Sequence, residues 1–152
     1  GNTEATEEEM WQALHLISAD KVVERMGQGL QSDVGEGGDS LSTGEKQLLS
    51  FARVLLADPR IFVLDEATSS VDSETERLIQ NATETVMRGR TSFVIAHRLS
   101  TIRNADVILA VRGGKIVESG THDALMAQKG YYYTLYTRQF EDEQTKKTLD
   151  NA

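Results

Sequence analysis

The hydrophobic pattern of this chain changes between helical spacing and short unbroken apolar runs. Apolar residues fall three and four positions apart in residues 10–22, 48–56 and 78–86, which predicts three amphipathic helical segments. Residues 61–64 and 91–96 are instead continuous apolar, β-rich runs, which are typical of strands buried on both faces of a parallel sheet. The order strand, helix, strand is a β-α-β unit. The pattern therefore predicts an α/β protein.

Three S/T-x-x-E patterns mark where helices begin. In this capping box the hydroxyl accepts from the first turn and the glutamate reaches back to the cap's own amide. The pairs are Thr6 with Glu9, Ser42 with Glu45, and Ser73 with Glu76. The first helical region is expected to break near residues 18–20, and the helix from Ser73 to end near Met87, before Gly89.

The end of the chain predicts a hairpin and two helices. Gly113 and Gly114 separate two β-rich runs, the two-residue hairpin signal, and Thr121 then caps a short helix. Four tyrosines within residues 131–136 lie on a last helix expected to end near Phe140. Because no basic residues interleave with them, packing against the hairpin is favoured over stacking on bases. A polar tail after the helix is predicted to be disordered.

Composition narrows the possible partners. The net charge of −8 argues against a nucleic-acid backbone, whose binding needs lysine and arginine. The chain has no cysteine, so disulfides are excluded. No apolar run approaches the roughly 20 residues of a membrane helix. A membrane role would therefore act through partners or through a segment outside this sequence.

Two places along residues 41–72 carry candidate chemistry. The helix that Ser42 caps offers unpaired first-turn amides, with Gly44 removing a side chain, and so suits an anion such as phosphate. The next strand ends in Asp65 and Glu66. Ligands bind at the carboxyl ends of strands in open α/β sheets. One acid can hold Mg²⁺ and the other can orient or deprotonate water for attack on a phosphoryl group.

An ordered set of motifs extends this interpretation. The motifs are LSTGE at 41–45, IFVLDE at 61–66, SSVD at 69–72, IAHR at 95–98 and ADVILAVRGGKIVESG at 105–120. They resemble, in order, the signature loop, the Walker B strand with its catalytic glutamate, the D-loop, the switch-histidine segment and the following hairpin of ATP-binding-cassette (ABC) ATPases. The set covers nearly the whole chain and is far more specific than any single motif.

The resemblance implies part of a P-loop NTPase-like fold, divided into a helical subdomain and a core subdomain. Residues 1–57 would form the helical signature subdomain and residues 58–140 the later part of the ATPase core, with a mainly parallel sheet, a hairpin and helices. Residues 141–152 would be the disordered tail. The sequence contains no G-x-x-x-x-G-K-[ST] loop and no glutamine loop. We therefore expect a fragment of a cassette that lacks both, binds ATP weakly, does not hydrolyse it alone, and exposes an apolar sheet surface.

The resemblance also implies roles on the catalytic side of the site. Asp65 would position Mg²⁺, directly or through water, and Glu66 would act on the attacking water. His97 follows the second strand and would sense the γ-phosphate of ATP, with one ring nitrogen donating and the other accepting. A lone histidine at a strand end is more often structural, so the motif and not the position carries this role.

The opposite side of each site would come from a second cassette, because two cassettes are implied to sandwich two ATP molecules head to tail. Ser42 and the amides of Thr43 and Gly44 would bind the γ-phosphate, with Glu45 beside it. Ser69 to Asp72 would link the two sites. Thr43 and Glu45 depart from the family's usual glycine and glutamine. Such a loop suits one half of a heterodimeric exporter with unequal sites, although Glu66 indicates that the Walker B side of this half is competent, and a homodimer stays open.

The implied parent is a multidrug or lipid exporter integral to the membrane, with this chain at its cytoplasmic face. Residues Asp33 to Gly37 are similar to the loop with which exporter-type cassettes contact their transmembrane domains. Two alternatives stay open. A chromosome-maintenance or repair ATPase head shares the LSTGEK form, although the IAHR segment and the hairpin resemble a transporter. The other is a non-catalytic interaction module that has lost its P-loop, against which the presence of Glu66 and His97 argues.

Overall fold

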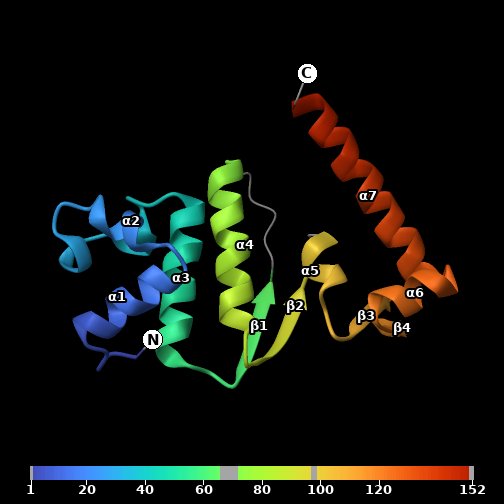
Figure 1. Ribbon diagram of the computed structural model, residues 1–152, viewed down its shortest axis with the longest axis horizontal. Helices are drawn as coiled ribbons and strands as arrows, with labels where there is room; N and C mark the ends of the chain where they lie inside the picture. The colour runs from blue at the N-terminus through green and yellow to red at the C-terminus, as the bar shows by residue number, and fades with distance from the viewer. Residues whose placement is uncertain (1, 66–71, 97–98, 151–152) are drawn as a thin grey trace. The chain divides into compact units, whose positions relative to one another are not determined.

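The computed structural model describes residues 2–65, 72–96 and 99–150 (Figure 1). The chain divides into two compact units, which are described separately. The first unit is Gly1–Leu64 with Thr68–Val94, and the second is Asp65–Ala67 with Ile95–Ala152. No helix of the described ranges is both long enough and apolar enough to cross a membrane.

The first unit is built from helices around a pair of strands. Its elements are α1 (Glu7–Leu16), α2 (Asp20–Glu24), the 3-10 turns η1 (Gly29–Gln31) and η2 (Glu36–Gly38), α3 (Thr43–Ala57), β1 (Ile61–Asp65), α4 (Ser73–Met87) and β2 (Thr91–Ile95). The predicted break between α1 and α2 is confirmed, as are the capping boxes of α1 at Thr6 and of α3 at Ser42.

The strands β1 and β2 are hydrogen-bonded neighbours joined through α4. Thr91 N donates to Arg60 O at 3.1 Å, which brings the starts of the two strands together, and their arrows run the same way (Figure 1). The predicted β-α-β unit is therefore confirmed. Arg90 fixes the turn before β1, because its guanidinium donates to Asp58 Oδ1 at 2.6 Å and to Val86 O at 2.6 Å.

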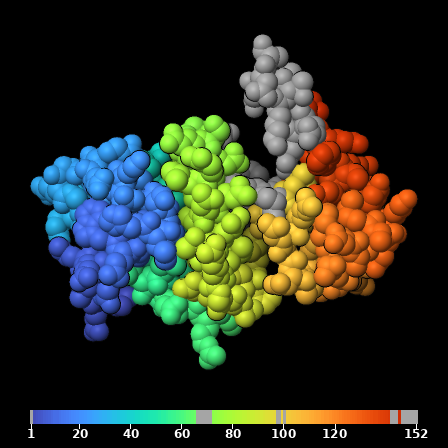
Figure 2. All heavy atoms as spheres, viewed as in Figure 1, coloured from blue at the N-terminus to red at the C-terminus, as the bar shows by residue number. Residues whose placement is uncertain are grey.

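The core of the first unit lies between the helices and one face of these strands. α3 packs against both α1 and α4, and Phe51 of α3 meets Phe62 of β1 edge to face at 6.5 Å between ring centroids. In the space-filling view, atoms of α1, α2 and α4 lie at the front of this unit, and part of α3 is visible between them (Figure 2). The buried residues are Ala13, Leu14, Ile17, Ala19, Val22, Val23, Leu48, Phe51, Ala52, Phe62, Ile79, Ala82 and Val86.

Two predictions about this unit are wrong. The strands are buried on one face only, since Ile61 and Val63 are 63% and 67% exposed and Phe93 and Ile95 are also exposed. Their unbroken apolar pattern is that of a doubly covered strand, but the described residues of this unit cover one face. The expectation of an exposed apolar sheet surface is confirmed.

The cap of α4 is the second correction. It is Asp72, one residue before the predicted Ser73, and Asp72 Oδ1 accepts from Thr75 N at 2.9 Å. Aspartate is among the strongest N-caps, so it takes the position from the serine that follows it. The predicted end at Met87 is confirmed, and Gly89 follows with φ 71°.

The second unit is a hairpin flanked by helices. Its elements are α5 (Leu99–Arg103), β3 (Ile108–Arg112), β4 (Lys115–Gly120), α6 (His122–Gln128) and α7 (Tyr131–Asp150). The strands pair antiparallel, with an irregularity between Ala110 and Val111. The turn needs glycines because Gly113 and Gly114 have φ of 56° and 74°, where a side chain is strained. The predicted hairpin is confirmed.

The helices of this unit pack on one face of the hairpin, as predicted for the tyrosines. Ala110, Leu125 and Tyr132 are buried together, and the Tyr132 hydroxyl lies 2.8 Å from His122 Nδ1. Burial, and then the nearby Tyr136, raise the pKa of Tyr132 to about 12, so this phenol stays neutral.

The last helix is longer than predicted. It continues past Phe140 to Asp150, through the residues expected to form a disordered tail. Residues 141–150 contain no glycine or proline and are rich in Glu, Gln and Lys, which are good helix formers. The helix propensity of these residues therefore decides the backbone conformation.

Candidate functional site

The start of α3 is the best-defined part of the predicted site. Ser42 has extended backbone angles, and its hydroxyl accepts from Glu45 N at 3.3 Å while Glu45 Oε2 accepts from Ser42 N at 2.9 Å. Gly44 is buried, whereas Ser42 and Thr43 are exposed. The capping box uses the amides of the cap and of the third helical residue, so those of Thr43 and Gly44 keep no intrahelical partner. These two amides can donate to an anion, to which the helix dipole adds.

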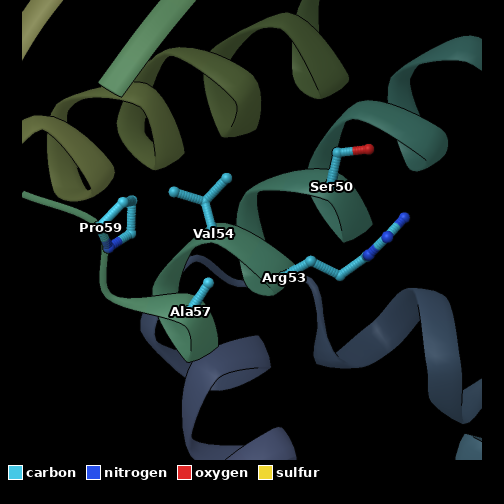
Figure 3. Close-up of a pocket in the computed structure, with 5 residues that line it drawn as sticks. All are labelled: Ser50, Arg53, Val54, Ala57 and Pro59. Carbon is cyan, nitrogen blue, oxygen red and sulfur yellow. The ribbon is translucent and has the colours of Figure 1, made fainter. Parts of the chain in front are cut away.

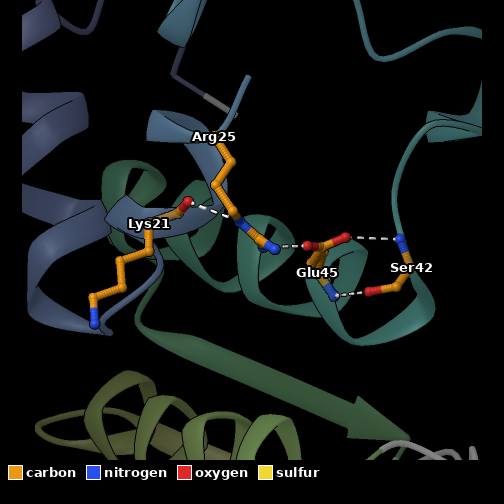
Figure 4. A network of polar contacts seen from close by, with 4 residues as sticks. All are labelled: Lys21, Arg25, Ser42 and Glu45. Atoms are coloured by element: carbon orange, nitrogen blue, oxygen red, sulfur yellow. Dashed lines mark hydrogen bonds and ion pairs between the residues drawn. The ribbon is translucent and has the colours of Figure 1, made fainter. Parts of the chain in front are cut away.

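Glu45 carries a further contact at the same place. Arg25, the residue after α2, donates from its guanidinium to Glu45 Oε1 at 2.5 Å and from Nε to Lys21 O at 3.2 Å (Figure 4). The hydrogen bond from the Ser42 amide lowers the pKa of Glu45, and those from the Ser42 hydroxyl and Arg25 lower it further. Glu45 is therefore a carboxylate at neutral pH, and both of its oxygens are engaged.

Asp65 is the described member of the predicted metal and catalytic group. It is the last residue of β1 and is exposed. A lone carboxylate at a strand end suits Mg²⁺, which is commonly held by one or two carboxylates together with substrate phosphates. The described ranges contain no cluster of three acidic or histidine ligands for a metal.

Glu66 and His97 lie outside the described residues, as do residues 69–71 of the predicted D-loop. The strands before them are described. β1 ends at Asp65 and β2 at Ile95, and as parallel neighbours they end at one edge. The expectation that Glu66 and His97 share this edge stays a prediction, as do their roles.

In the structure, Asp72 is the N-cap of α4. Its carboxylate caps α4, and this hydrogen bond from the Thr75 amide lowers the pKa of Asp72. The capping oxygen is Oδ1, and the side chain is exposed. The predicted link between two nucleotide sites remains a proposal.

The loop at Asp33 to Gly37 has a folded conformation. Asp33 Oδ1 accepts from Gly35 N at 2.9 Å, and Gly35 has a φ of 76°. Val34 O accepts from both the amide and the hydroxyl of Ser40, at 3.3 and 3.1 Å. These bonds fold the segment back on itself and leave Asp33 and Glu36 exposed. The loop therefore carries two acidic side chains on its exposed surface.

Sequence reasoning missed Arg25. Twenty positions separate it from Glu45, and no capping or periodicity rule connects them. A hollow on the other half of α3, lined by Ser50, Arg53, Val54, Ala57 and Pro59, was also not expected (Figure 3). It contains none of the predicted site residues.

Comparisons with known proteins agree with the motifs. Residues 2–69 match the family model described as ABC transporter. A probable multidrug resistance ABC transporter ATP-binding/permease protein of Bacillus subtilis is 53% identical over 134 residues, which cover 88% of this chain and 20% of that protein. An ATP-dependent lipid A-core flippase of Colwellia psychrerythraea is 49% identical over 141 residues, with coverages of 93% and 23%.

A solved structure gives the same result. A bacterial Atm1-family ABC exporter with ATP bound superposes with a TM-score of 0.77 at 38% identity, over 90% of this chain and 24% of that chain. These relatives are transporters, which does not favour the repair ATPase head or the non-catalytic module. The chain spans between a fifth and a quarter of their length. It belongs to the ABC transporter family and corresponds to part of the P-loop NTPase-like, ATP-binding portion of these relatives.

Proposed function

We propose that this chain takes part in ATP binding and hydrolysis within a longer exporter. The observation that carries the proposal is the start of α3, where a capping box leaves the exposed Thr43 amide and the neighbouring Gly44 amide without intrahelical partners. The Ser42 hydroxyl accepts from Glu45 N at the same helix start, and its hydrogen bond to the Glu45 carboxylate would be exchanged for one to a bound phosphate. Together these donors suit the γ-phosphate of an ATP molecule held by a second nucleotide-binding domain.

The facing half of the site uses the edge where β1 and β2 end. Asp65 would hold Mg²⁺, whose charge would offset that of the phosphates. Glu66 would accept a hydrogen bond from the attacking water and orient it, and His97 would contact the γ-phosphate. The strand ends support this grouping, because Asp65 and Ile95, the last residues of the two neighbouring strands, lie at the same edge of the sheet (Figure 1).

The proposed partners follow from two surfaces. The start of α3 needs a second nucleotide-binding domain, identical or not, to bring it an ATP molecule. The folded acidic loop from Asp33 to Gly37 would contact the transmembrane domains at the cytoplasmic face of the membrane. Within this scheme, residues 1–57 act as the helical signature subdomain and residues 58–140 as the later part of the ATPase core.

The test is complementation. The chain is mixed with a fragment of an exporter nucleotide-binding domain that carries the P-loop and glutamine loop, and Mg²⁺-dependent ATP hydrolysis is measured. We expect turnover only after mixing, and its loss when this chain carries Glu66→Gln. Hydrolysis by this chain alone would contradict the need for a P-loop from elsewhere. A folded, associated mixture without turnover would contradict the catalytic assignment.

A further inference from the structure

The residue at the third helical position of α3 creates an electrostatic problem for the proposed site. Glu45 places a negative charge in the same first turn whose amides are proposed to bind phosphate. A carboxylate at a helix N-terminus is favourable for the helix itself. It also repels an approaching anion, and like charges within a few ångströms interact strongly near a protein surface. The site can work well only if this charge is offset.

Arg25 is placed to offset it. Val22 and Val23 of α2 are buried in the core of the first unit and so anchor the short helix that Arg25 follows. The Nε bond to Lys21 O turns the guanidinium toward α3, where it meets Glu45 Oε1 (Figure 4). The Arg25 side chain is 68% exposed and that of Glu45 only 22%. The cation therefore covers the acid from the solvent side.

The two carboxylate oxygens of Glu45 accept from different donors. Oε2 accepts from the Ser42 amide, and Oε1 accepts from Arg25. Without the Arg25 contact, Oε1 would have one fewer donor, and the carboxylate could rotate toward the first-turn amides. Arg25 thus restrains the carboxylate in the capping geometry and leaves the amides of Thr43 and Gly44 available.

We propose that Arg25 is a positioning residue for the phosphate-binding start of α3: it holds the Glu45 carboxylate on the Ser42 amide and neutralises its charge toward nucleotide. This inference rests on the proposed function, because it assigns Arg25 a role at that same site. Arg25 acts through Glu45 and does not contact the nucleotide in this scheme.

The test uses the full-length transporter that carries this segment, with ATP hydrolysis measured against ATP concentration. Arg25→Gln is expected to raise the KM for ATP about three- to tenfold at low salt, with kcat changed less than about twofold. The increase should shrink at high ionic strength, because the pair is partly exposed to solvent. Arg25→Lys should restore most of the affinity, since it keeps the charge.

Two further variants separate electrostatics from stability. Glu45→Gln added to Arg25→Gln should return the KM close to that of the unmodified protein, because no charge is left to offset. Arg53→Gln removes an equal positive charge at an exposed position of α3, the helix that carries Glu45, and should leave the KM unchanged. Melting temperatures are recorded for every variant, so that a loss of folding is not read as a loss of affinity.

The outcomes distinguish the two proposals. An unchanged KM in Arg25→Gln, or a raised KM that Glu45→Gln does not correct, overturns the role of Arg25 while the proposed function stands. If the unmodified transporter shows no Mg²⁺-dependent hydrolysis that Glu66→Gln removes, the proposed function fails and the role of Arg25 with it. An Arg25→Gln protein with a lower melting temperature and an unchanged KM makes the ion pair structural only.

Discussion

The starts of α3 and α7 use a glutamate in opposite ways. At α3, Glu45 lies within the helix and bonds back to the Ser42 amide, which leaves the amides of Thr43 and Gly44 without helix partners. At α7, Glu118 of β4 accepts from the amides of both Tyr131 and Tyr132, at 2.6 and 2.7 Å. The start of α7 is closed, because Glu118 of a neighbouring strand accepts from its first amides and so joins the two elements. The start of α3 is open, because it is capped from within and the amides of Thr43 and Gly44 stay available to an anion.

The largest effect is expected at the closed helix start. Glu118→Ala removes a carboxylate that satisfies two half-buried amides, so it should destabilise the second unit by about 2 to 4 kcal/mol. Glu118→Gln, which keeps one acceptor oxygen, should cost about half as much. Chemical unfolding followed by the tyrosine signal measures both. Equal stability of Glu118→Ala and the unmodified chain would show that α7 does not depend on this contact.

Gly130 provides a second way to break the closed start. A Cβ at Gly130 would collide with the Glu118 carboxylate, so Gly130→Ala should destabilise the protein by about 1 to 3 kcal/mol. Gly27 is a matched control, because nothing lies within 4 Å of a Cβ built there. Gly27→Ala should change the unfolding free energy by less than about 0.5 kcal/mol. The comparison fails if the two variants unfold alike.

The open start is probed against another capping box of the same form. Ser42→Ala and Thr6→Ala each remove a hydroxyl that accepts at 3.3 Å, so each should cost about 1 kcal/mol of stability. Calorimetry gives these values. The two variants should differ in ATP hydrolysis by the full-length transporter, which only Ser42→Ala is expected to reduce. A similar loss with Thr6→Ala would mean that helix capping alone explains the effect.

The smallest effect concerns pH. The pKa of Glu45 is lowered from its ordinary 4.5, first by the Ser42 amide, so the folded state binds its proton less readily than the unfolded state. The stabilising contribution is therefore present above about pH 4.5 and is lost as the pH falls through the folded pKa. Glu45→Gln should be less stable than the unmodified chain at pH 6, by less than about 1 kcal/mol, with the difference shrinking toward pH 3. A difference that does not depend on pH would contradict this assignment.

Local spacing was enough to predict the cap of the open start and several other elements. These features depend on residues within a few positions of one another: the capping boxes at Thr6 and Ser42, the strand that ends at Asp65, and the hairpin at Gly113. A local rule failed by one residue at Asp72, because aspartate and serine in succession can both cap a helix.

The contacts that distinguish the two helix starts were beyond such rules. Arg25 and Glu45 are twenty positions apart, and Glu118 is more than ten from the amides it caps. These pairs depend on how packed elements meet in space. The apolar run around Ile61 and Val63 by itself predicted burial on both faces, since such a run does not tell how many of its faces are covered. Their exposure was expected only from the missing P-loop part of a cassette.

Amide hydrogen exchange in the full-length transporter tests the central claim most directly. Glu66→Gln is used to hold Mg²⁺-ATP, and exchange is compared with and without nucleotide. The account predicts that ATP slows exchange at Thr43 and Gly44 and leaves Tyr131 and Tyr132, already bonded to Glu118, unchanged. Unchanged exchange at Thr43 and Gly44 in a protein shown to hold ATP would contradict the claim that the open start of α3 binds phosphate.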